Sequence, residues 1–361
     1  MIRVAIIGAG IGREHLRAYL QLPDDYVVPV LCDLDAARAA EVIVNERADP
    51  AVTHVTSDFD AVLARDDIDL IDICLPPHLH FDISMTALQA GKHVVCEKPL
   101  VSSLRDADAL IAAAEAAGRV LTPVFQYRYG PEIAKLRALI DAGFAGKPLV
   151  ASIETHWRRD ADYYDNPWRG TWQGEQGGAV LGHAIHNHDL LCAILGPIKR
   201  LSAFTATRVN KIEVEDCAAI SFEMESGALA TSSITLGAAN DTSRFRFCFE
   251  NLTAESDLLP YTPAAGTWTF TTRNRDQAAL DAFLAGQPAP PLGFVGFFAA
   301  LAQALQNNGT DAVVAMDGRR SLELVSAIYE SARNGRMIDL PLGANAALYN
   351  GWLPEKTGFL E

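Results

Sequence analysis

The first third of the chain alternates two kinds of segment, and this alternation constrains the fold more than any other feature. Short, nearly continuous apolar runs are separated by stretches with helical periodicity. Such runs are typical of strands buried on both faces of a parallel sheet. They cover Ile2–Ile7, Val27–Cys32, Ile68–Leu75, Val94–Cys96 and Val120–Phe125, with helices expected at Glu14–Leu20, Ala36–Glu46, Phe81–Ala90 and Leu104–Ala117. The pattern predicts right-handed crossovers and a doubly wound α/β sheet.

The periodicity changes after about residue 123. Beyond a predicted helix at Pro131–Asp141, apolar and polar residues alternate in long stretches, as in antiparallel strands. These are Val150–Arg158, Arg200–Val209, Ala218–Glu225, Ala228–Leu236 and Arg244–Glu250, with helices expected at Ala179–Leu195, Phe294–Gln306 and Gly318–Ala332. A chain of 361 residues suits two domains, which we place at 1–123 and 124–361. The second is expected to be an α/β domain with a large, open, mainly antiparallel sheet.

Charge and composition argue against several classes of function. The net charge of −15 repels phosphate backbones, so nucleic-acid binding is not expected. No apolar run approaches the ~20 residues that span a bilayer, and the N-terminus opens directly into a strand pattern, without a signal peptide. The six cysteines form no Cys-x-x-Cys pair. These features predict a cytoplasmic protein with reduced cysteines.

A glycine-rich turn joins the first predicted strand to the first predicted helix. Glycines there let backbone N–H groups approach a pyrophosphate, which the positive end of the helix would face. The spacing departs from G-x-G-x-x-G, because the third glycine comes one residue early and Arg13 stands in its place. We interpret the turn as part of a dinucleotide site; the alternative is a purely structural turn. Its residues are Gly8, Gly10, Ile11 and Gly12.

Asp33 ends the second predicted strand. A carboxylate there can accept hydrogen bonds from both adenosine ribose hydroxyls and would repel a 2′-phosphate, so NAD is favoured over NADP. Arg38 lies one turn further on and is expected near the adenine. The alternative role for Asp33 is to cap the helix that begins at Ala36.

Two later segments follow buried strands and therefore reach the carboxyl edge of the sheet, where open α/β folds bind ligands. They are Leu75–His80 and Glu97–Pro99. Lys98 would place a charge at the mouth of an apolar strand, unless it is an ordinary solvated loop lysine. Structural roles for the histidines of the first segment remain open. The candidate cofactor residues here are Leu75, Pro76, His80, Glu97 and Lys98.

The chain resembles the glucose–fructose oxidoreductase / inositol dehydrogenase / MocA family. The resemblance rests on the glycine turn, on Pro-x-x-x-His at residues 76–80, and on Ala-Gly-Lys-His-Val…Glu-Lys-Pro-Leu at residues 90–100. It extends over essentially the whole chain, including the segment 125–131. It implies a Rossmann domain that binds NAD and a larger α/β domain whose open sheet often makes dimer or tetramer contacts. We therefore expect a homodimer or homotetramer.

The family resemblance also implies roles for particular residues. The lysine matching Lys98 orients the reacting hydroxyl and helps to move its proton, and the residue matching Glu97 lies near the cofactor. A lysine in a partly dry pocket has its charged form disfavoured, which suits proton transfer near neutral pH. Gln126, at the domain crossover, and the pair Trp168 and Arg169 are candidates for cofactor contacts, with loop packing as the alternative for that pair.

The segment 177–189 carries the candidate substrate histidines. The family usually has an aspartate followed four residues later by a histidine; here His186 matches the histidine, but Gly182 stands at the aspartate position. His183 is three residues before His186, so one helix would place both on the same face. We expect His186, with His183, to position substrate and accept its proton. A metal is undetermined: His188 and Asp189 are near, but His188 should point away.

Polar residues at alternate positions of the predicted strand Val150–Arg158 suggest a negatively charged substrate. Glu154, His156 and Arg158 share one face of their predicted strand. With Arg128 and Arg169 nearby in the family layout, the site would be locally cationic and suited to a carboxylate. The alternative is an exposed polar sheet face.

These features together predict an NAD-dependent oxidoreductase. Hydride would pass between nicotinamide C4 and a secondary hydroxyl of a sugar acid, sugar or polyol, with Lys98 and His186 handling the proton. One alternative is an isomerase or glycosidase that recycles tightly held NAD. Another is a non-catalytic sugar or nucleotide sensor, which the glycine at position 182 would favour.

Overall fold

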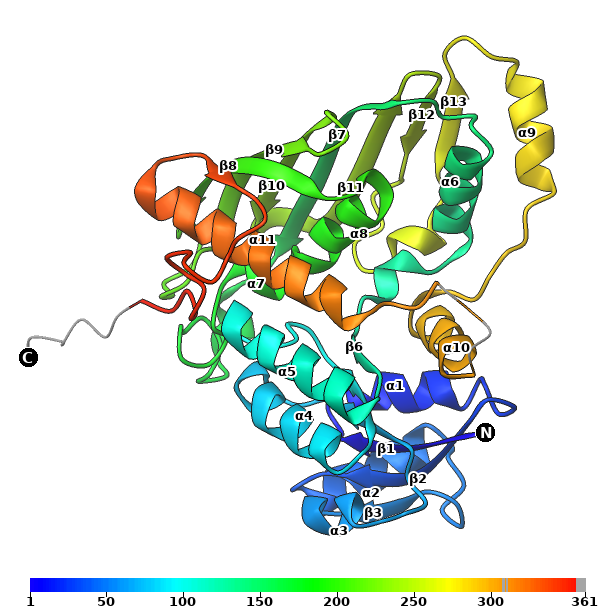
Figure 1. The fold of residues 1–361 in the computed structure, drawn as a ribbon, viewed down its shortest axis with the longest axis vertical. Coiled ribbons are helices and arrows are strands. Elements are labelled where there is room, and N and C mark those ends of the chain that lie inside the picture. Colours follow the sequence, from blue (N-terminus) through cyan, green and yellow to red (C-terminus); the bar gives the residue numbers. More distant parts are fainter. Residues whose placement is uncertain (307–308, 310, 355–361) are drawn as a thin grey trace, which may run out of the picture. The chain divides into compact units, whose positions relative to one another are not determined.

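The computed structural model describes residues 1–306, 309 and 311–354. The chain forms two compact units, each built from two stretches of sequence (Figure 1). Of the described residues, unit 1 contains 1–126 and 294–322, and unit 2 contains 127–293 and 323–354.

Unit 1 contains a six-stranded parallel sheet in the order β3-β2-β1-β4-β5-β6. The strand order reverses between β1 and β4. In doubly wound folds, ligands bind in the crevice at the carboxyl ends of the strands at this point. The predicted doubly wound parallel sheet is confirmed. Only β3 has no predicted counterpart, because this three-residue edge strand buries no side chain completely. The strands are β1 Ile2–Ile7, β2 Tyr26–Cys32, β3 His54–Thr56, β4 Leu70–Ile73, β5 His93–Cys96 and β6 Leu121–Pro123.

The helices of unit 1 begin and end at recognisable signals. Ser103 Oγ accepts the N–H of Asp106 at 3.0 Å, which caps the start of α5. Gly118 ends that helix in the left-handed conformation, with φ 61°. The helices of the first stretch are α1 Gly12–Tyr19, α2 Ala36–Asn45, α3 Phe59–Leu63, α4 His80–Gln89 and α5 Leu104–Ala117.

The described residues between 294 and 322 pack with unit 1, whereas the sequence prediction placed them in the second domain. The helix α10, Gly293–Leu305, provides the reason. Its Phe298 stacks on Tyr19 of α1 with 3.9 Å between ring centroids, and its carbonyl accepts the Tyr26 hydroxyl at 2.8 Å. Thr122 Oγ1 also donates to the carbonyl of Val313 at 2.7 Å. Burial of these aromatic rings makes the segment part of unit 1. The pattern of predicted strands and helices contains no signal for such a long-range contact.

Unit 2 contains an eight-stranded mixed sheet in the order β13-β12-β11-β7-β10-β9-β8-β14. All neighbours are antiparallel except β7 and β10, which are parallel. The predicted, mainly antiparallel sheet is confirmed. The strands are β7 Pro148–Arg158, β8 Ile198–Ala206, β9 Cys217–Met224, β10 Leu229–Thr235, β11 Gly237–Phe249, β12 Leu252–Glu255, β13 Thr269–Thr272 and β14 Ile338–Asp339.

One face of this sheet is covered from within unit 2. Asn187 Nδ2 donates to Thr155 Oγ1 of β7 at 2.7 Å, and His188 Nε2 lies 3.0 Å from Ser232 Oγ of β10. The C-terminal segment packs against the loop that precedes α7, because Trp352 is fully buried and its Nε1 donates to the carbonyl of Gln176 at 2.6 Å. The other helices are α6 Pro131–Asp141, α7 Ala179–Gly182, α8 Ile185–Leu195, α9 Gln277–Ala285 and α11 Ala315–Asn334, the last beginning in unit 1.

Candidate active site

The three glycines of the turn after β1 occupy different environments. Gly8 has φ 104°, and a Cβ there would lie 2.4 Å from the carbonyl oxygen of Cys74. A Cβ at Gly12 would lie 2.8 Å from Ile6 Cγ2, so α1 packs closely on β1 only because position 12 has no side chain. A Cβ at Gly10 would meet no other part of the described chain within 4 Å. The turn thus combines a tight bend, an open approach and close helix packing, as a pyrophosphate loop requires.

Asp33 follows β2, and its carboxylate is contacted by three groups. Oδ2 accepts the N–H of Ala9 at 2.7 Å, Oδ1 accepts the N–H of Asp35 at 2.8 Å, and Arg38 Nη2 lies 2.6 and 2.8 Å from the two oxygens. Although burial alone would raise it, these partners lower the pKa of Asp33 below its ordinary value. Asp33 is therefore ionised at neutral pH and bonded directly to the glycine turn.

His80 links the two predicted cofactor segments of unit 1. Its buried ring places Nε2 2.8 Å from the carbonyl oxygen of Leu75 and Nδ1 2.7 Å from that of Pro99. Burial lowers the pKa of His80, so the neutral ring, with one N–H, donates to one carbonyl at a time. These contacts are structural, and the predicted cofactor contact of His80 stays a prediction.

Glu97 and Lys98 follow β5, and the carboxylate of Glu97 bonds to groups on both sides of it. Its Oε2 accepts the backbone N–H of Lys98 at 3.0 Å, and its Oε1 lies 3.2 Å from His15 Nε2. Glu97 thus connects α1 to the backbone of the candidate catalytic lysine, whose side chain is half-buried. His15 was not among the residues predicted from the sequence. The available signal was its place on the buried face of α1, three residues after the glycine turn.

Three remaining cofactor candidates of unit 1 lie at the ends of its elements. Ile11 precedes α1 and is 41% exposed, so the loop presents an apolar side chain to its surroundings. Pro76 precedes the short 3₁₀ helix Pro77–Leu79. The side-chain oxygen of Gln126 is buried without a hydrogen-bond partner among the described residues.

The single helix predicted over Ala179–Leu195 is wrong, because α7 ends at Gly182 and α8 begins at Ile185. His183 lies between them with φ −120° and ψ −53°, so it does not share a helix face with His186. Glycine is among the weakest helix formers, which makes position 182 a favourable place for the break. A Cβ at Gly182 would meet no other described atom within 4 Å, so a larger side chain fits there.

The two candidate histidines contact different aromatic side chains. His186, on α8, is 6% exposed and stacks on Tyr127 with 4.6 Å between ring centroids. His183 packs edge-to-face on Trp157 at 5.4 Å, and its Nε2 lies 3.4 Å from the Tyr163 hydroxyl. Both imidazoles are thus oriented by ring packing, a rigid way to present a proton acceptor.

Arg128 forms a bidentate ion pair with Asp189. Nε donates to Oδ2 at 2.7 Å and Nη2 donates to Oδ1 at 2.6 Å, with the two side chains 14% and 2% exposed. The pair fixes α8 to the segment that precedes α6. Its geometry directs two of the guanidinium donors toward Asp189, and the predicted substrate contact of Arg128 stays a prediction.

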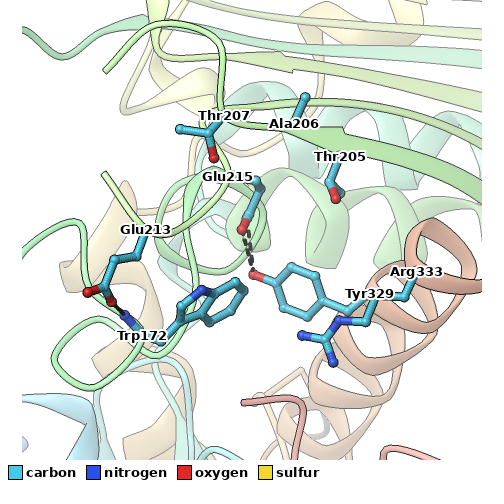
Figure 2. A pocket seen from close by; sticks show the side chains of 8 residues that line it. All are labelled: Trp172, Thr205, Ala206, Thr207, Glu213, Glu215, Tyr329 and Arg333. Atoms are coloured by element: carbon cyan, nitrogen blue, oxygen red, sulfur yellow. Dashed lines mark hydrogen bonds between the residues drawn. The ribbon is translucent and has the colours of Figure 1, made fainter. Parts of the chain in front are cut away.

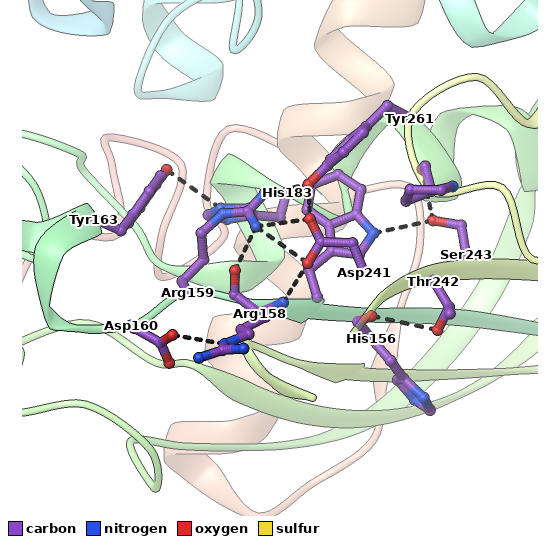
Figure 3. A network of polar contacts seen from close by, with 12 residues as sticks. His156, Arg158, Arg159, Asp160, Tyr163, His183, Asp241, Thr242, Ser243 and Tyr261 are labelled. Atoms are coloured by element: carbon purple, nitrogen blue, oxygen red, sulfur yellow. Dashed lines mark hydrogen bonds and ion pairs between the residues drawn. The ribbon is translucent and has the colours of Figure 1, made fainter. Parts of the chain in front are cut away.

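Arg159, which the sequence analysis passed over, lies in an aromatic box beside His183 (Figure 3). Its guanidinium carbon lies 5.2, 5.2 and 5.9 Å from the ring centroids of Trp157, Tyr163 and Tyr261. Nη1 pairs with Asp241 at 3.2 Å, and Nε is buried without a partner among the described residues. The box concentrates positive charge and aromatic surface at one place in unit 2.

His156 and Arg158 lie on the opposite face of β7 from this box. His156 Nε2 lies 2.8 Å from Ser233 Oγ, and Arg158 is 61% exposed and pairs with Asp160 at 2.6 Å. Trp157, between them in sequence, is buried on the face that contacts His183. Because side chains alternate along a strand, the structure does not bring His156 and Arg158 together with the candidate histidines.

Arg169 contacts Tyr163, whose hydroxyl lies beside His183. Its guanidinium carbon lies 4.1 Å from the Tyr163 ring centroid and 4.5 Å from that of Trp168, and Nη1 lies 3.1 Å from Glu175 Oε1. Nη1 also donates to the Tyr163 hydroxyl. The Trp168–Arg169 pair is therefore packed against the residues that line His183, and its predicted cofactor contact stays a prediction.

Potential metal ligands do not converge at the candidate histidines. Among the described residues, the one group of three is His15, Asp72 and Cys74, all buried in unit 1. Burial lowers the pKa of His188 to about 4, so its ring is neutral at pH 7. The ring faces the sheet, where its Nε2 contacts Ser232 Oγ. The geometry therefore gives no support to a metal site around residues 183–189.

A separate cavity of about 270 Å³ opens in unit 2 (Figure 2). Glu215 lines the cavity and accepts hydrogen bonds from the N–H groups of Gly178 and Val180, at 3.2 and 3.0 Å, and from the Tyr329 hydroxyl. Burial raises the pKa of Glu215 to about 7. The carboxyl thereby fixes the start of α7. The cavity is lined by Trp172, Thr205, Ala206, Thr207, Glu213, Glu215, Tyr329 and Arg333.

Comparison with known families agrees with this architecture. Residues 2–125 match the model of an oxidoreductase family with an NAD-binding Rossmann fold, and residues 133–255 match the GFO/IDH/MocA C-terminal domain. The chain belongs to the GFO/IDH/MocA oxidoreductase family. It is accordingly an enzyme of an oxidoreductase family, with an NAD-binding Rossmann domain. The predicted cofactor contacts of the glycine turn and of Asp33 stay predictions. No described helix has both the length and the apolar character needed to cross a membrane.

Members of the GFO/IDH/MocA family resemble the chain over most of its length. The oxidoreductase YrbE of Bacillus subtilis is 30% identical over 63% of this chain and 65% of its own. D-Apiose dehydrogenase of Paraburkholderia graminis is 28% identical over 93% of this chain and 89% of its own. The WlbA dehydrogenase from Bordetella pertussis, solved with NADH and UDP-GlcNAcA, is 26% identical, with a TM-score of 0.81 over 95% of this chain and 98% of that one.

Proposed function

We propose that the chain oxidises or reduces a secondary hydroxyl carbon of a carbohydrate, with a sugar acid as the preferred substrate class. When bound, NAD accepts or donates the hydride at nicotinamide C4. The observation that carries the proposal is the polar carboxyl edge of the Rossmann sheet, where Glu97 binds the backbone of Lys98. The names of relatives, which include D-apiose dehydrogenase and an inositol 2-dehydrogenase, support carbohydrate hydroxyls as targets.

We further propose that Lys98 and His186 manage the hydroxyl proton. Lys98 is half-buried at the mouth of β5, where it can donate a hydrogen bond to a substrate oxygen. His186 is held by its stack on Tyr127, and a neutral imidazole accepts a proton near pH 7. Gly182 leaves no carboxylate at the position where relatives of this type usually have one, so the proton role falls to the histidine.

The preference for a sugar acid rests on the arginines around His183. Arg159 and Arg169 both contact the Tyr163 ring, and Arg159 Nε is buried without a partner among the described residues. A substrate carboxylate would compete with Asp241 for Arg159 and satisfy that buried N–H. A neutral sugar would leave the pairing with Asp241 intact.

The test is the appearance of NADH absorbance when the protein and NAD meet a panel of aldonic acids, uronic acids, aldoses and polyols. Activity that is highest with an acid, is lost in Lys98→Ala, and shows a raised KM for the acid in Arg159→Leu would support the proposal. An equal preference for neutral sugars would remove the sugar-acid assignment. NAD binding without turnover of any compound would contradict the dehydrogenase role and favour recycled NAD or a sensor.

We also propose that the protein works in the cytoplasm as a homo-oligomer. All six cysteines are free, as a reducing compartment would keep them. The open face of the unit 2 sheet exposes apolar side chains on three of its strands: Phe204 on β8 is 76%, Leu229 on β10 56% and Val150 on β7 50% exposed. His156 lies on the same face, as the strand register requires. A second copy packed there would bury this patch, and Phe204→Asp would then shift light scattering from an oligomeric mass to the 39.0 kDa monomer.

A further inference from the structure

A chain of buried ionisable groups in unit 1 begins on α1, the helix that follows the glycine turn. His15, on α1, is fully buried; its Nδ1 lies 2.9 Å from Asp72 Oδ2 and its Nε2 lies 3.2 Å from Glu97 Oε1. Glu97 in turn accepts the backbone N–H of Lys98 at 3.0 Å. One imidazole therefore connects the middle of the sheet, at Asp72 in β4, to the backbone of Lys98 after β5.

The surroundings of His15 are dry on its remaining sides. The rings of Phe294 and Phe298 from α10 lie 4.7 and 5.3 Å from the imidazole, measured between centroids. Cys74 Sγ lies 3.3 Å from Nδ1. Although burial alone would lower it, Asp72 and Cys74 raise the pKa of His15 well above its ordinary value. A protonated ring donates from both nitrogens, which matches an acceptor on each side.

Stability alone does not account for this arrangement. Taking three ionisable groups out of water is costly, and well-packed apolar residues of similar volume usually stabilise a core as well or better. The cluster does, however, fix the Glu97 carboxylate in one orientation, with one oxygen toward His15 and the other toward Lys98. A carboxylate held at both oxygens cannot rotate away from the lysine backbone without breaking a buried charge-assisted hydrogen bond.

We propose that His15 is a positioning residue for hydride transfer, which acts through Glu97 to fix the backbone that carries Lys98. Asp72 anchors the imidazole from the opposite side. The inference rests on the proposed role of Lys98. It predicts that loss of His15 slows the chemical step and leaves substrate and NAD affinity unchanged.

The experiment compares His15→Asn with Tyr26→Phe as a matched control. Asn is too short to reach both carboxylates. Tyr26→Phe removes a different buried hydrogen bond, to Phe298, in the same aromatic cluster. His15→Asn should lower kcat by about 10- to 100-fold, as a ~1 Å misplacement does, with little change in either KM. Tyr26→Phe should lower the melting temperature and leave kcat unchanged.

A double-mutant cycle separates positioning from simple support of the fold. If His15 acts through Glu97, the variant carrying both His15→Asn and Glu97→Ala should be no slower than Glu97→Ala alone. Effects that multiply, or equal losses of kcat in His15→Asn and Tyr26→Phe, would overturn the proposal. Asp72→Asn provides a second route if His15→Asn does not fold: it keeps the side-chain shape and should lower kcat in the same way.

Two further readouts keep the outcomes distinct. Metal analysis of the purified protein should find no stoichiometric zinc; zinc that is lost in both His15→Asn and Asp72→Asn would show a metal site instead of a positioning chain. Lys98→Ala tests the proposed function by itself. Unchanged kcat there would refute the role of Lys98, whereas an inactive Lys98→Ala beside a fully active His15→Asn would refute only the role of His15.

Discussion

Glu215 gives unit 2 a pH-dependent stability that can be worked out from the structure. Burial raises its pKa from 4.5 to about 7, although two backbone N–H groups and the Tyr329 hydroxyl favour the ionised form. Because the folded-state pKa lies above the unfolded value, the folded protein binds the extra proton between these limits. The stability of unit 2 should therefore fall as pH rises through this range.

The magnitude follows from the shift of the Glu215 pKa. At 1.36 kcal/mol per unit, ionising this buried carboxyl costs the folded state roughly 3 kcal/mol in total, of which about 2 kcal/mol should appear between pH 5.5 and pH 8. Glu215→Gln removes the titrating proton and should remove this slope. The free energy of unfolding of the wild type should thus decline relative to that of the variant by about 2 kcal/mol across the interval.

Urea unfolding followed by tryptophan fluorescence measures this effect in the right place, because all five tryptophans lie in unit 2. Glu213→Gln is the matched control, since Glu213 lines the same cavity, is exposed and accepts the Trp172 N–H. It should keep the wild-type slope. Parallel curves for the wild type and Glu215→Gln, within about 0.5 kcal/mol from pH 5.5 to 8, would refute a buried carboxyl that titrates near neutrality.

Three other predictions follow from unit 1 and the α7–α8 break. Asp33→Ser should free Arg38, whose side chain is 54% exposed, to bind a 2′-phosphate, so the ratio of kcat/KM for NADP to that for NAD should rise at least about tenfold; an unchanged ratio would show that Asp33 does not discriminate. Gly10→Ala should fold normally but bind NAD more weakly in calorimetry, whereas Gly8→Ala should lose at least about 1–3 kcal/mol of stability because its Cβ would meet the Cys74 carbonyl; equal stability losses would contradict the two environments. Gly182→Asp should leave the melting temperature unchanged, since its side chain meets open space, and should alter the pH profile of kcat by adding a carboxylate near His183; a large drop in melting temperature would contradict the space seen there.

The sequence predicts well whatever is fixed by local chemistry. Apolar runs located every strand of the parallel sheet except β3. The helix expected at Leu104–Ala117 matches α5 to the residue, between the cap at Ser103 and the left-handed Gly118. The glycine turn and Asp33 could be paired in advance because both follow neighbouring strands, and the structure joins them through the Ala9 N–H. These features depend on residues close in sequence or on the known direction of parallel strands.

What the sequence could not provide depends on pairing between distant segments. The return of residues 294–322 to unit 1 follows from aromatic packing of Phe298 on Tyr19, 279 positions earlier. Sequence periodicity showed that His156 and Arg158 share a face, but not which face is buried, so it favoured the exposed arginine over Arg159. The assumption of one continuous helix hid the break at His183.

The buried ionisable groups are the hardest to foresee and the most informative once seen. The sequence around His15 predicts an ordinary helix, and the sequence around Glu215 predicts the start of a strand. Each side chain nevertheless contacts a segment that carries a candidate site residue. His15 contacts Glu97, which binds Lys98, and Glu215 binds the first turn of α7, which leads to His183. Apolar residues would usually fill such positions at a lower desolvation cost. The presence of ionisable groups there is therefore better explained by their orienting of candidate site residues than by a gain in stability. A comparison of kcat and unfolding free energy in variants of both residues would separate these two contributions directly.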